Sequence, residues 1–348
     1  GCSVAVVGPA VPVDDPLVRM SPWNTRIKQS GRIKRIGLAL RAALAERAEI
    51  YHFHDLELIT LGLALKVLSP GSAVVYDVHE DYPAMMMEKH WLPREVRPLV
   101  ASAARVAQLA ASLCLDGIVT ADPGVEADFR AVAGKRKIVY YNFPVLSVFE
   151  PRRAEPSVAK ADLVYIGGMS ERAGTFVLLD ALIELAAHGI RPSVRLAGYT
   201  DGDVGWQALQ KAIQDRGLDA EVELRGRMPH SEVPAWIRSG RVGLVTLQPI
   251  EKFMKNIPSK MFEYWACGLP VIGSDLPPIA RFLADGSNGV LFSPSSPRDL
   301  ARAIRFLLER PEEAAAMGRS GQQLVYEKWN SDQQVDQLVH FYERIRHR

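Results

Sequence analysis

The chain has 348 residues, 48% of them hydrophobic and 24% charged, which suits a soluble globular protein with two domains. Its formal net charge of +2 is too close to balance for a dedicated nucleic-acid binder, so we expect no nucleic-acid partner. The three cysteines, Cys2, Cys114 and Cys267, are widely separated, which indicates neither a disulfide framework nor a zinc site.

The first part of the chain alternates short apolar strands with longer helical patterns. The expected strands are Ser3–Val7, Ile50–Phe53, Ala73–Tyr76, Gly117–Thr120 and Lys137–Tyr141. The expected helices between them are Ile33–Ala48, Leu56–Val67 and Glu95–Leu113. This order predicts a parallel sheet wound with helices.

A basic segment, Arg19–Arg41, carries seven cations and no acid, with apolar residues between them. Two interpretations remain open. The segment is either a solvated edge of the first domain or a peripheral contact with an anionic membrane surface.

The second part repeats the same alternation. Its expected strands are Leu163–Gly167, Ser193–Ala197, Val222–Arg225, Val242–Val245, Val271–Gly273 and Gly289–Phe292. Helices are expected to begin near Thr175, Gly205, Glu232, Lys260, Pro277 and Pro297. The fold class predicted is therefore α/β, with two Rossmann-like, doubly wound domains.

The domains are expected at residues 1–144 and 163–330, joined by a proline-containing linker at 145–162. Residues 331–348 contain a final amphipathic helix, Asp332–Arg346, that either caps the second domain or crosses back to the first. Two such domains facing one another would form a cleft, because parallel α/β sheets bind ligands at the carboxyl ends of their strands.

The segment from Asn256 to Asp275 is the most informative part of the sequence. A polar loop leads into a helix near Ser259, with Lys255 and Lys260 beside its amino end. Glu263, one turn later, would be placed to accept bonds from both ribose hydroxyls of a nucleotide. The alternative is that Lys260 and Glu263 form an ordinary pair on a helix surface. No GxGxxG or Walker A sequence is present, so an NAD(P) dehydrogenase is a weak alternative.

This Pro-x-Lys-x-x-Glu segment resembles the hallmark of family 4 glycosyltransferases, which have the GT-B fold. Further segments match that family in order and spacing, namely Tyr76–Glu80, Tyr165–Gly168, Leu224–Gly226 and Gly286–Gly289. The resemblance implies a retaining enzyme of the bacterial cytoplasm that uses a nucleotide-diphosphate sugar and a sugar or lipid-linked acceptor, in surface polysaccharide or glycolipid synthesis. It also implies that the first domain lacks its first strand–helix unit, since family members begin with one before the equivalent of Ser3–Val7.

The resemblance assigns roles in the second domain. Glu263 would hold the donor ribose, and Arg227 and Met228 would lie on the nucleoside side. The donor sugar would contact the loop Asn256, Ile257, Pro258 and Ser259. The donor diphosphate would be bound by Gly167, Gly168, Arg172, Lys255 and Lys260. Two positions depart from the family pattern, because Lys255 and Arg281 stand where acidic residues are usual.

In the first domain, His79, Glu80 and Asp81 follow a strand directly and are expected to be catalytic, with His79 beside the donor sugar. His54 and Asp55 are expected on the acceptor side, whereas His52 is expected to be structural. No Asp-x-Asp sequence lies where a metal would be expected, so we expect neither a metal nor any cofactor besides the donor. A GT-B epimerase or phosphorylase, and a nucleotide-sugar-binding pseudoenzyme, remain as alternatives.

Overall fold

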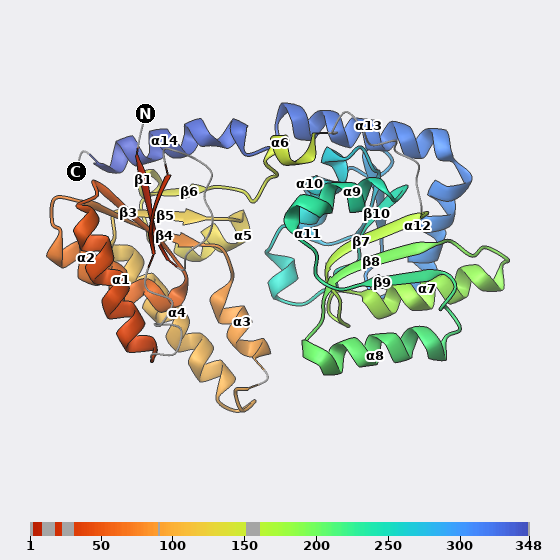
Figure 1. The fold of residues 1–348 in the computed structure, drawn as a ribbon, viewed down its shortest axis with the longest axis horizontal. Coiled ribbons are helices and arrows are strands. Elements are labelled where there is room, and N and C mark those ends of the chain that lie inside the picture. Colours follow the sequence, from red (N-terminus) through yellow and green to blue (C-terminus); the bar gives the residue numbers. More distant parts are fainter. Residues whose placement is uncertain (1–2, 9–17, 23–30, 90, 151–160, 347–348) are drawn as a thin grey trace. The chain divides into compact units, whose positions relative to one another are not determined.

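The computed structural model describes residues 3–8, 18–22, 31–89, 91–150 and 161–346. It divides into two compact units, which are described separately (Figure 1). Unit 1 comprises Gly1–Tyr141 together with Asp336–Arg348, and unit 2 comprises Asn142–Val335. Most of the last helix, α14 (Asp332–Arg346), therefore packs as part of unit 1.

Unit 1 is built on a sheet of four parallel strands in the order β3-β4-β5-β6. The strands are β3 (Ile50–His54), β4 (Ala73–Val78), β5 (Gly117–Thr120) and β6 (Lys137–Val139). Its helices are α1 (Arg32–Glu46), α2 (Ile59–Leu68), α3 (Tyr82–Glu88), α4 (Arg97–Cys114), α5 (Pro123–Glu126) and α14. The alternation of strands and helices that the sequence predicts is confirmed here, and the short helices α3 and α5 are additions to it.

Both faces of this sheet are buried, which explains the nearly continuous apolar sequence of β4. Val74 and Tyr76 pack into the core cluster that contains α1 and α2 residues. Val75 points to the opposite face and packs with Phe341 of α14. A Cβ atom on Gly117 would lie 2.7 Å from the Phe341 ring, so glycine allows α14 to approach the sheet closely.

The first predicted strand does not join this sheet. Within the part of the chain that the structure describes, β1 (Val4–Gly8) pairs in parallel with β2 (Val18–Pro22), and the two form a separate two-stranded sheet. The predicted strand is therefore present but lies outside the main sheet, and its side chains Val4 and Val6 are 47% and 41% exposed. Residues 23–30 of the basic segment Arg19–Arg41 lie outside the described residues.

Unit 2 is built on six parallel strands in the order β12-β11-β10-β7-β8-β9. In chain order these are β7 (Leu163–Gly168), β8 (Val194–Tyr199), β9 (Val222–Arg225), β10 (Val242–Val245), β11 (Val271–Ser274) and β12 (Gly289–Phe292). Counted from β7 as the first strand, this is the doubly wound order 3-2-1-4-5-6, which confirms the predicted Rossmann-like domain. The point where the order reverses lies between β7 and β10.

Helices cover both faces of the unit 2 sheet (Figure 1). They are α6 (Leu146–Phe149), α7 (Thr175–Ala187), α8 (Gly202–Asp215), α9 (Val233–Arg238), α10 (Ser259–Ala266), α11 (Pro277–Ala280), α12 (Pro297–Glu309) and α13 (Pro311–Glu327). Residues of α7, α8 and α12 form one large apolar cluster with the strands. Among the described helices, none is both long enough and apolar enough to cross a membrane.

Helix α10 is fixed onto the sheet by Tyr264, which is fully buried. The Ile166 backbone N–H of β7 donates to the Tyr264 hydroxyl at 2.9 Å. A Cβ atom on Gly243 of β10 would lie 2.4 Å from the Tyr264 ring. These contacts set the amino end of α10 beside the strands at which the order reverses.

The predicted linker at 145–162 begins as structured chain. Residues 146–149 form α6, and Phe149 is 1% exposed within unit 2. The Arg238 guanidinium donates to the Phe149 carbonyl oxygen. The apolar side chain of Phe149 therefore packs this part of the expected linker onto unit 2, while residues 151–160 lie outside the described residues.

Candidate functional site

The loops at the β7–β10 reversal are locked together by their backbones. The Thr246 hydroxyl donates to the Ala173 carbonyl oxygen at 2.8 Å, and the Gln248 N–H donates to the Arg172 carbonyl oxygen at 2.9 Å. A Cβ atom on Gly174, whose φ is +74°, would lie 1.8 Å from the Thr246 carbonyl oxygen. Only glycine allows this approach, so the loop after β7 has a defined position beside the loop after β10.

The predicted Gly167-Gly168 pair ends β7 in an open conformation. Gly167 has a φ of +122°, and a Cβ atom there would lie 3.2 Å from Lys260 Nζ. On the neighbouring strand, a Cβ atom on Gly198 would lie 1.8 Å from the Gly167 carbonyl oxygen. The glycines thus allow the two strand ends to approach each other closely, with the Lys260 ammonium beside Gly167.

Lys260, on the first turn of α10, is partly buried with its ammonium 4.0 Å above the ring centre of Tyr165. Burial lowers the pKa of Lys260 to about 8, although the nearby Glu263 and Tyr199 favour its charged form. A desolvated cation beside a glycine-containing strand end and a helix amino terminus is suited to binding an anion such as a diphosphate. The structure therefore brings together Lys260 and the Gly167-Gly168 pair, which the sequence analysis placed at one site.

Glu263, one turn further along α10, is partly buried. Burial raises the pKa of Glu263, while His230 and Lys260 act in the opposite direction. His230 follows β9 in the same loop as Arg227 and Met228, and the sequence analysis missed it. The available signal was its position just after a strand end, where site residues gather.

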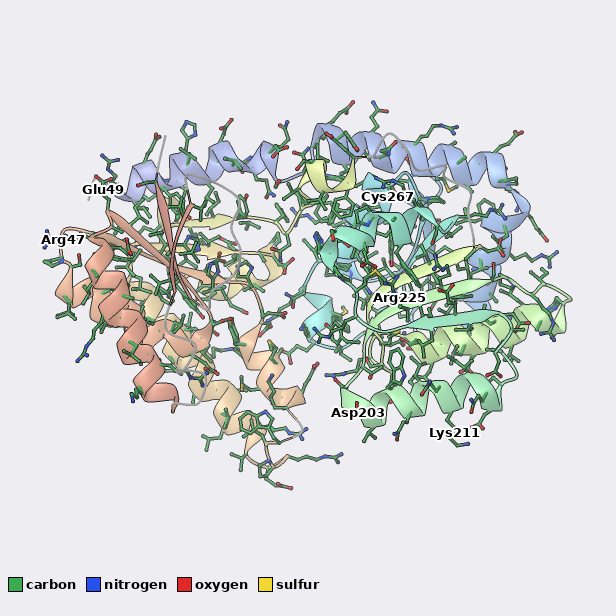
Figure 2. All side chains as sticks on the ribbon, viewed as in Figure 1. Arg47, Glu49, Asp203, Lys211, Arg225 and Cys267 are labelled. Atoms are coloured by element: carbon green, nitrogen blue, oxygen red, sulfur yellow. The ribbon has the colours of Figure 1, made fainter. Side chains whose placement is uncertain are left out.

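The loop after β9 is held at both of its ends. Arg225, labelled in Figure 2, ends β9, and its Nη2 lies 2.6 Å from Glu232 Oε2. The guanidinium of Arg227 lies 4.4 Å from the ring centre of Tyr199, which ends β8. Arg227 is exposed, so its charge stays accessible beside the neighbouring strand end.

The other residues of unit 2 that the sequence analysis assigned to the donor site lie in the loops before α7 and α10. Arg172 Nη2 lies 3.5 Å from Asp201 Oδ2, a long ion pair. Lys255 ends a short 3-10 turn, Lys252–Met254, just before α10. The loop residues Asn256, Ile257 and Pro258 are partly buried and Ser259 is exposed at the start of the helix.

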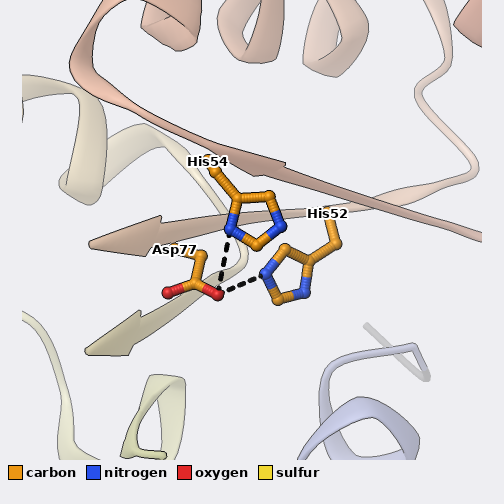
Figure 3. Close-up of side chains that lie close together, drawn as sticks. All are labelled: His52, His54 and Asp77. Atoms are coloured by element: carbon orange, nitrogen blue, oxygen red, sulfur yellow. Dashed lines mark hydrogen bonds and ion pairs between the residues drawn. The ribbon is translucent and has the colours of Figure 1, made fainter. Parts of the chain in front are cut away.

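A second group of polar side chains lies at the carboxyl ends of β3 and β4 in unit 1. Asp77 Oδ2 is 2.9 Å from His52 Nε2, 3.3 Å from His54 Nδ1 and 3.1 Å from His79 Nε2. Figure 3 shows His52 and His54 pointing to the same carboxylate oxygen of Asp77. The sequence analysis expected His52 to be structural and did not select Asp77 as a site residue, because it is the pairing of β3 with β4 that sets His54 opposite Asp77, with His52 two residues earlier on β3.

The electrostatics of this cluster follow from its hydrogen bonds. Burial acts to raise the pKa of Asp77, but the bonds to His52, His54 and His79 outweigh it and hold that pKa far below its usual range. The bond to Asp77 raises the pKa of His79, against the effect of partial burial. Asp77 is therefore an ionised carboxylate, buried to 5% exposure and surrounded by imidazoles.

The other predicted residues of unit 1 have local structural contacts. Asp81 is 2% exposed and caps α3 by accepting a hydrogen bond from the Ala84 N–H at 3.0 Å. Asp55 accepts a hydrogen bond from the Tyr82 hydroxyl at 2.6 Å. Glu80 is partly buried beside them. His79 is the member of the expected catalytic trio that lies beside Asp77, with its Nε2 3.1 Å from Asp77 Oδ2.

Comparison with known proteins shows the fold and a family match over part of the chain. Residues 160–310 match the family described as "Glycosyl transferases group 1". Alpha-D-kanosaminyltransferase of Streptomyces kanamyceticus is 25% identical over 53% of this chain and 45% of its own length. The putative colanic acid biosynthesis glycosyltransferase WcaL of Escherichia coli is 24% identical over 45% of this chain and 38% of its own length. The alignments thus span less than half of these relatives.

Solved structures share the fold at low sequence identity. Sucrose-phosphate synthase from Thermosynechococcus elongatus is 18% identical with a TM-score of 0.74, over 97% of this chain and 86% of that one. Anabaena HepE, solved in complex with UDP and glucose, is 14% identical with a TM-score of 0.69, over 93% of this chain and 86% of that one. The comparisons confirm two Rossmann-like domains of the GT-B class and support the group 1 glycosyltransferase family.

Proposed function

We propose that this chain is a retaining glycosyltransferase that moves a sugar from a nucleotide-diphosphate sugar to an acceptor hydroxyl. Unit 2 binds the nucleotide, and unit 1 supplies groups that act on the sugar and the acceptor. The observation that carries the proposal is the position of Lys260 over Tyr165, next to the Gly167 strand end and one turn from Glu263. The family match over residues 160–310 covers these same positions.

The chemistry required is neutralisation of charge on the leaving nucleoside diphosphate. Lys260 is the best-placed cation, because its partial burial strengthens its attraction for phosphate oxygens. Arg172 and Lys255 are proposed to assist it, so that no metal is needed at the diphosphate. Glu263 then accepts hydrogen bonds from the ribose, and the loop from Asn256 to Ser259 contacts the transferred sugar.

We assign the enzyme to family 4 and to bacterial surface polysaccharide or glycolipid synthesis. The similarity to WcaL, named for colanic acid biosynthesis, supports the polysaccharide class of product. The acceptor would be a sugar or a lipid-linked sugar, reached in the cytoplasm at the inner face of the membrane. The basic segment Arg19–Arg41 is the part of the sequence proposed to contact that surface.

Donor binding is tested by thermal-shift screening against UDP, GDP, ADP and TDP sugars, because a ligand that binds only the folded state raises its melting temperature. HepE was solved with UDP and glucose, which makes UDP-glucose the first donor to try. A shift with one base and not the others supports the donor site. No shift with any of them contradicts it.

Turnover separates an enzyme from a nucleotide-sugar-binding pseudoenzyme. The second candidate is favoured by Lys255, which stands where family members carry a glutamate that contacts the donor sugar. Release of nucleoside diphosphate that depends on added acceptor supports transfer. Tight donor binding without such release, across a panel of sugar and lipid-linked acceptors, supports the pseudoenzyme.

A further inference from the structure

The convergence of three histidines on one oxygen of Asp77 is not explained by donor binding. His52 Nε2, His54 Nδ1 and His79 Nε2 lie 2.9, 3.3 and 3.1 Å from Asp77 Oδ2. The second carboxylate oxygen, Oδ1, is buried and has no hydrogen-bond partner among the described residues. A carboxylate that served only as a hydrogen-bond acceptor would gain more by using both of its oxygens.

Hydrogen bonds alone do not satisfy the contacts within this cluster. His54 Nδ1 and His79 Nε2 are 3.0 Å from each other as well as close to Asp77 Oδ2, so three atoms make three contacts. Each ring nitrogen carries at most one proton, which gives two protons for three contacts. If both nitrogens are protonated, their N–H groups face each other. If one is not, its lone pair faces the carboxylate oxygen.

A bound metal ion would satisfy all three contacts at once, because each atom would direct a lone pair to the ion. Ligands about 2.0–2.1 Å from a tetrahedral ion are separated from one another by about 3.3 Å. The separations among His54 Nδ1, His79 Nε2 and Asp77 Oδ2 are 3.0, 3.1 and 3.3 Å. The triangle already has nearly the size of one face of such a coordination tetrahedron.

We propose that His54, Asp77 and His79 bind a divalent transition-metal ion of the Zn²⁺ class. Two imidazoles and one carboxylate favour Zn²⁺ and other divalent transition-metal ions over Mg²⁺ and Ca²⁺, which prefer oxygen ligands. His54 ends β3 and Asp77 lies opposite it on β4, so strand pairing itself places two of the ligands. His79 follows directly after β4.

His52 supports the site from outside the ligand set. Its Nε2 reaches Asp77 Oδ2 at 2.9 Å, and its Nδ1 lies 2.5 Å from the Tyr342 hydroxyl of α14. Such outer hydrogen bonds orient ligating carboxylates in metal sites. His52, His54 and Asp77 also offer ligand atoms within 4.8 Å of one another, so His54 and Asp77 are common to either choice of third ligand (Figure 3).

An ion with three protein ligands keeps an open coordination position. That position would take a water molecule or a hydroxyl oxygen and polarise it. The site lies wholly in unit 1, and its occupancy is measured without any nucleotide. If the metal site is disproved, the proposed donor site in unit 2 is therefore unaffected. If the donor site is disproved, the metal site is likewise unaffected.

The test is the metal content of the tag-free full chain after treatment with a chelator and dialysis against Zn²⁺. We expect one equivalent per chain in the wild type, and a Co²⁺-loaded sample with the visible absorption of a tetrahedral site. His54→Ala and Asp77→Asn should lose the stoichiometric ion. His340→Ala is the matched control, because His340 is exposed on α14 and its Nδ1 lies 2.6 Å from the Asp336 carbonyl oxygen of the same helix.

Zn²⁺ should also raise the melting temperature of the wild type and of His340→Ala, but not that of His54→Ala. His54 is exposed, with its side chain 54% accessible, so its alanine variant is expected to fold even if the Asp77 variant does not. A wild type without stoichiometric Zn²⁺, or a His54→Ala variant that binds it as the wild type does, would overturn the proposal. If His52→Ala loses the stoichiometric Zn²⁺ and His79→Ala keeps it, the proposal is also overturned, because His52 would then be the third ligand in place of His79.

Discussion

Each unit gathers polar groups at the carboxyl ends of the strands in its own parallel sheet. Unit 2 does so mainly with backbone, and unit 1 does so with side chains. In unit 2 the strand ends are shaped by backbone, because Gly167, Gly174 and Gly198 lie where a side chain would meet a neighbouring backbone or the Lys260 ammonium. In unit 1 the edge is filled by side chains, with three imidazoles on Asp77. A backbone-lined edge suits a large anion, whereas converging side chains suit a small ion or one reacting group.

The largest effect is expected for donor affinity in a unit 2 variant, which tests whether unit 2 binds the nucleotide. Glu263→Ala should weaken donor binding by at least about 100-fold, because the ribose would lose two charge-assisted hydrogen bonds worth about 1.5–3 kcal/mol each. Calorimetric titration of the donor measures the loss. Glu309→Ala, which removes an exposed glutamate paired with Arg305, is the control and should bind as the wild type does. Unchanged affinity in a folded Glu263 variant would remove the ribose role.

A unit 1 variant should show the opposite pattern to Glu263→Ala, with a loss of turnover rate and no loss of donor affinity. His79→Ala is expected to lower the turnover rate by about 100-fold while leaving nucleotide affinity unchanged, since a group acting on the transition state affects rate more than ground-state binding. Donor affinity and turnover are measured side by side, with His340→Ala as the control. Equal losses in affinity and rate, or no loss of rate, would make His79 structural.

The backbone character of the unit 2 edge is tested by two glycines in the left-handed region. Gly198→Ala should destabilise unit 2 by on the order of 3 kcal/mol or more, because its Cβ would lie 1.8 Å from a backbone oxygen that cannot yield easily. Gly286→Ala, at a φ of +76° with nothing within 4 Å, should cost only about 1–2 kcal/mol of strain. Chemical denaturation measures both. Equal losses would show that strain, not close approach, explains Gly198.

The smallest effect expected is a pH dependence from Lys260. Its pKa of about 8 in the folded protein lies below its unfolded value, so the unfolded chain binds more protons above pH 8. Stability without ligand should therefore rise as pH increases from about 8 to about 10.

Donor affinity should change in the opposite direction, falling up to about tenfold per pH unit above 8, because a neutral Lys260 must take up a proton to pair with phosphate. Titrations in two buffers of different ionisation enthalpy detect that proton. Lys211→Ala, on the exposed face of α8 with Asp215 at 2.8 Å, is the control and should keep the wild-type profile (Figure 2). If a Lys260→Ala variant still shows this pH dependence of donor affinity, the dependence comes from the titration of another group.

The sequence by itself was sufficient for the alternation of elements in both halves. β5, β9, β10 and β12 have the predicted bounds, because each is a short apolar run bordered by residues that end strands. Local signals at a helix start also marked Lys260 and Glu263 as a candidate nucleotide site, whereas Gly167 was assigned to that site through the family resemblance. These features depend on neighbouring residues, which a linear pattern records.

Tertiary structure decided what depends on residues far apart in the chain. The pairing of β3 with β4 sets His54 opposite Asp77, and α14 brings Tyr342 to His52 across 290 positions. The separate β1–β2 sheet and the packing of Phe149 onto unit 2 likewise depend on which surface each apolar residue finds. Composition and periodicity show that a residue is apolar or polar, but its partner is chosen by the close packing of the folded chain.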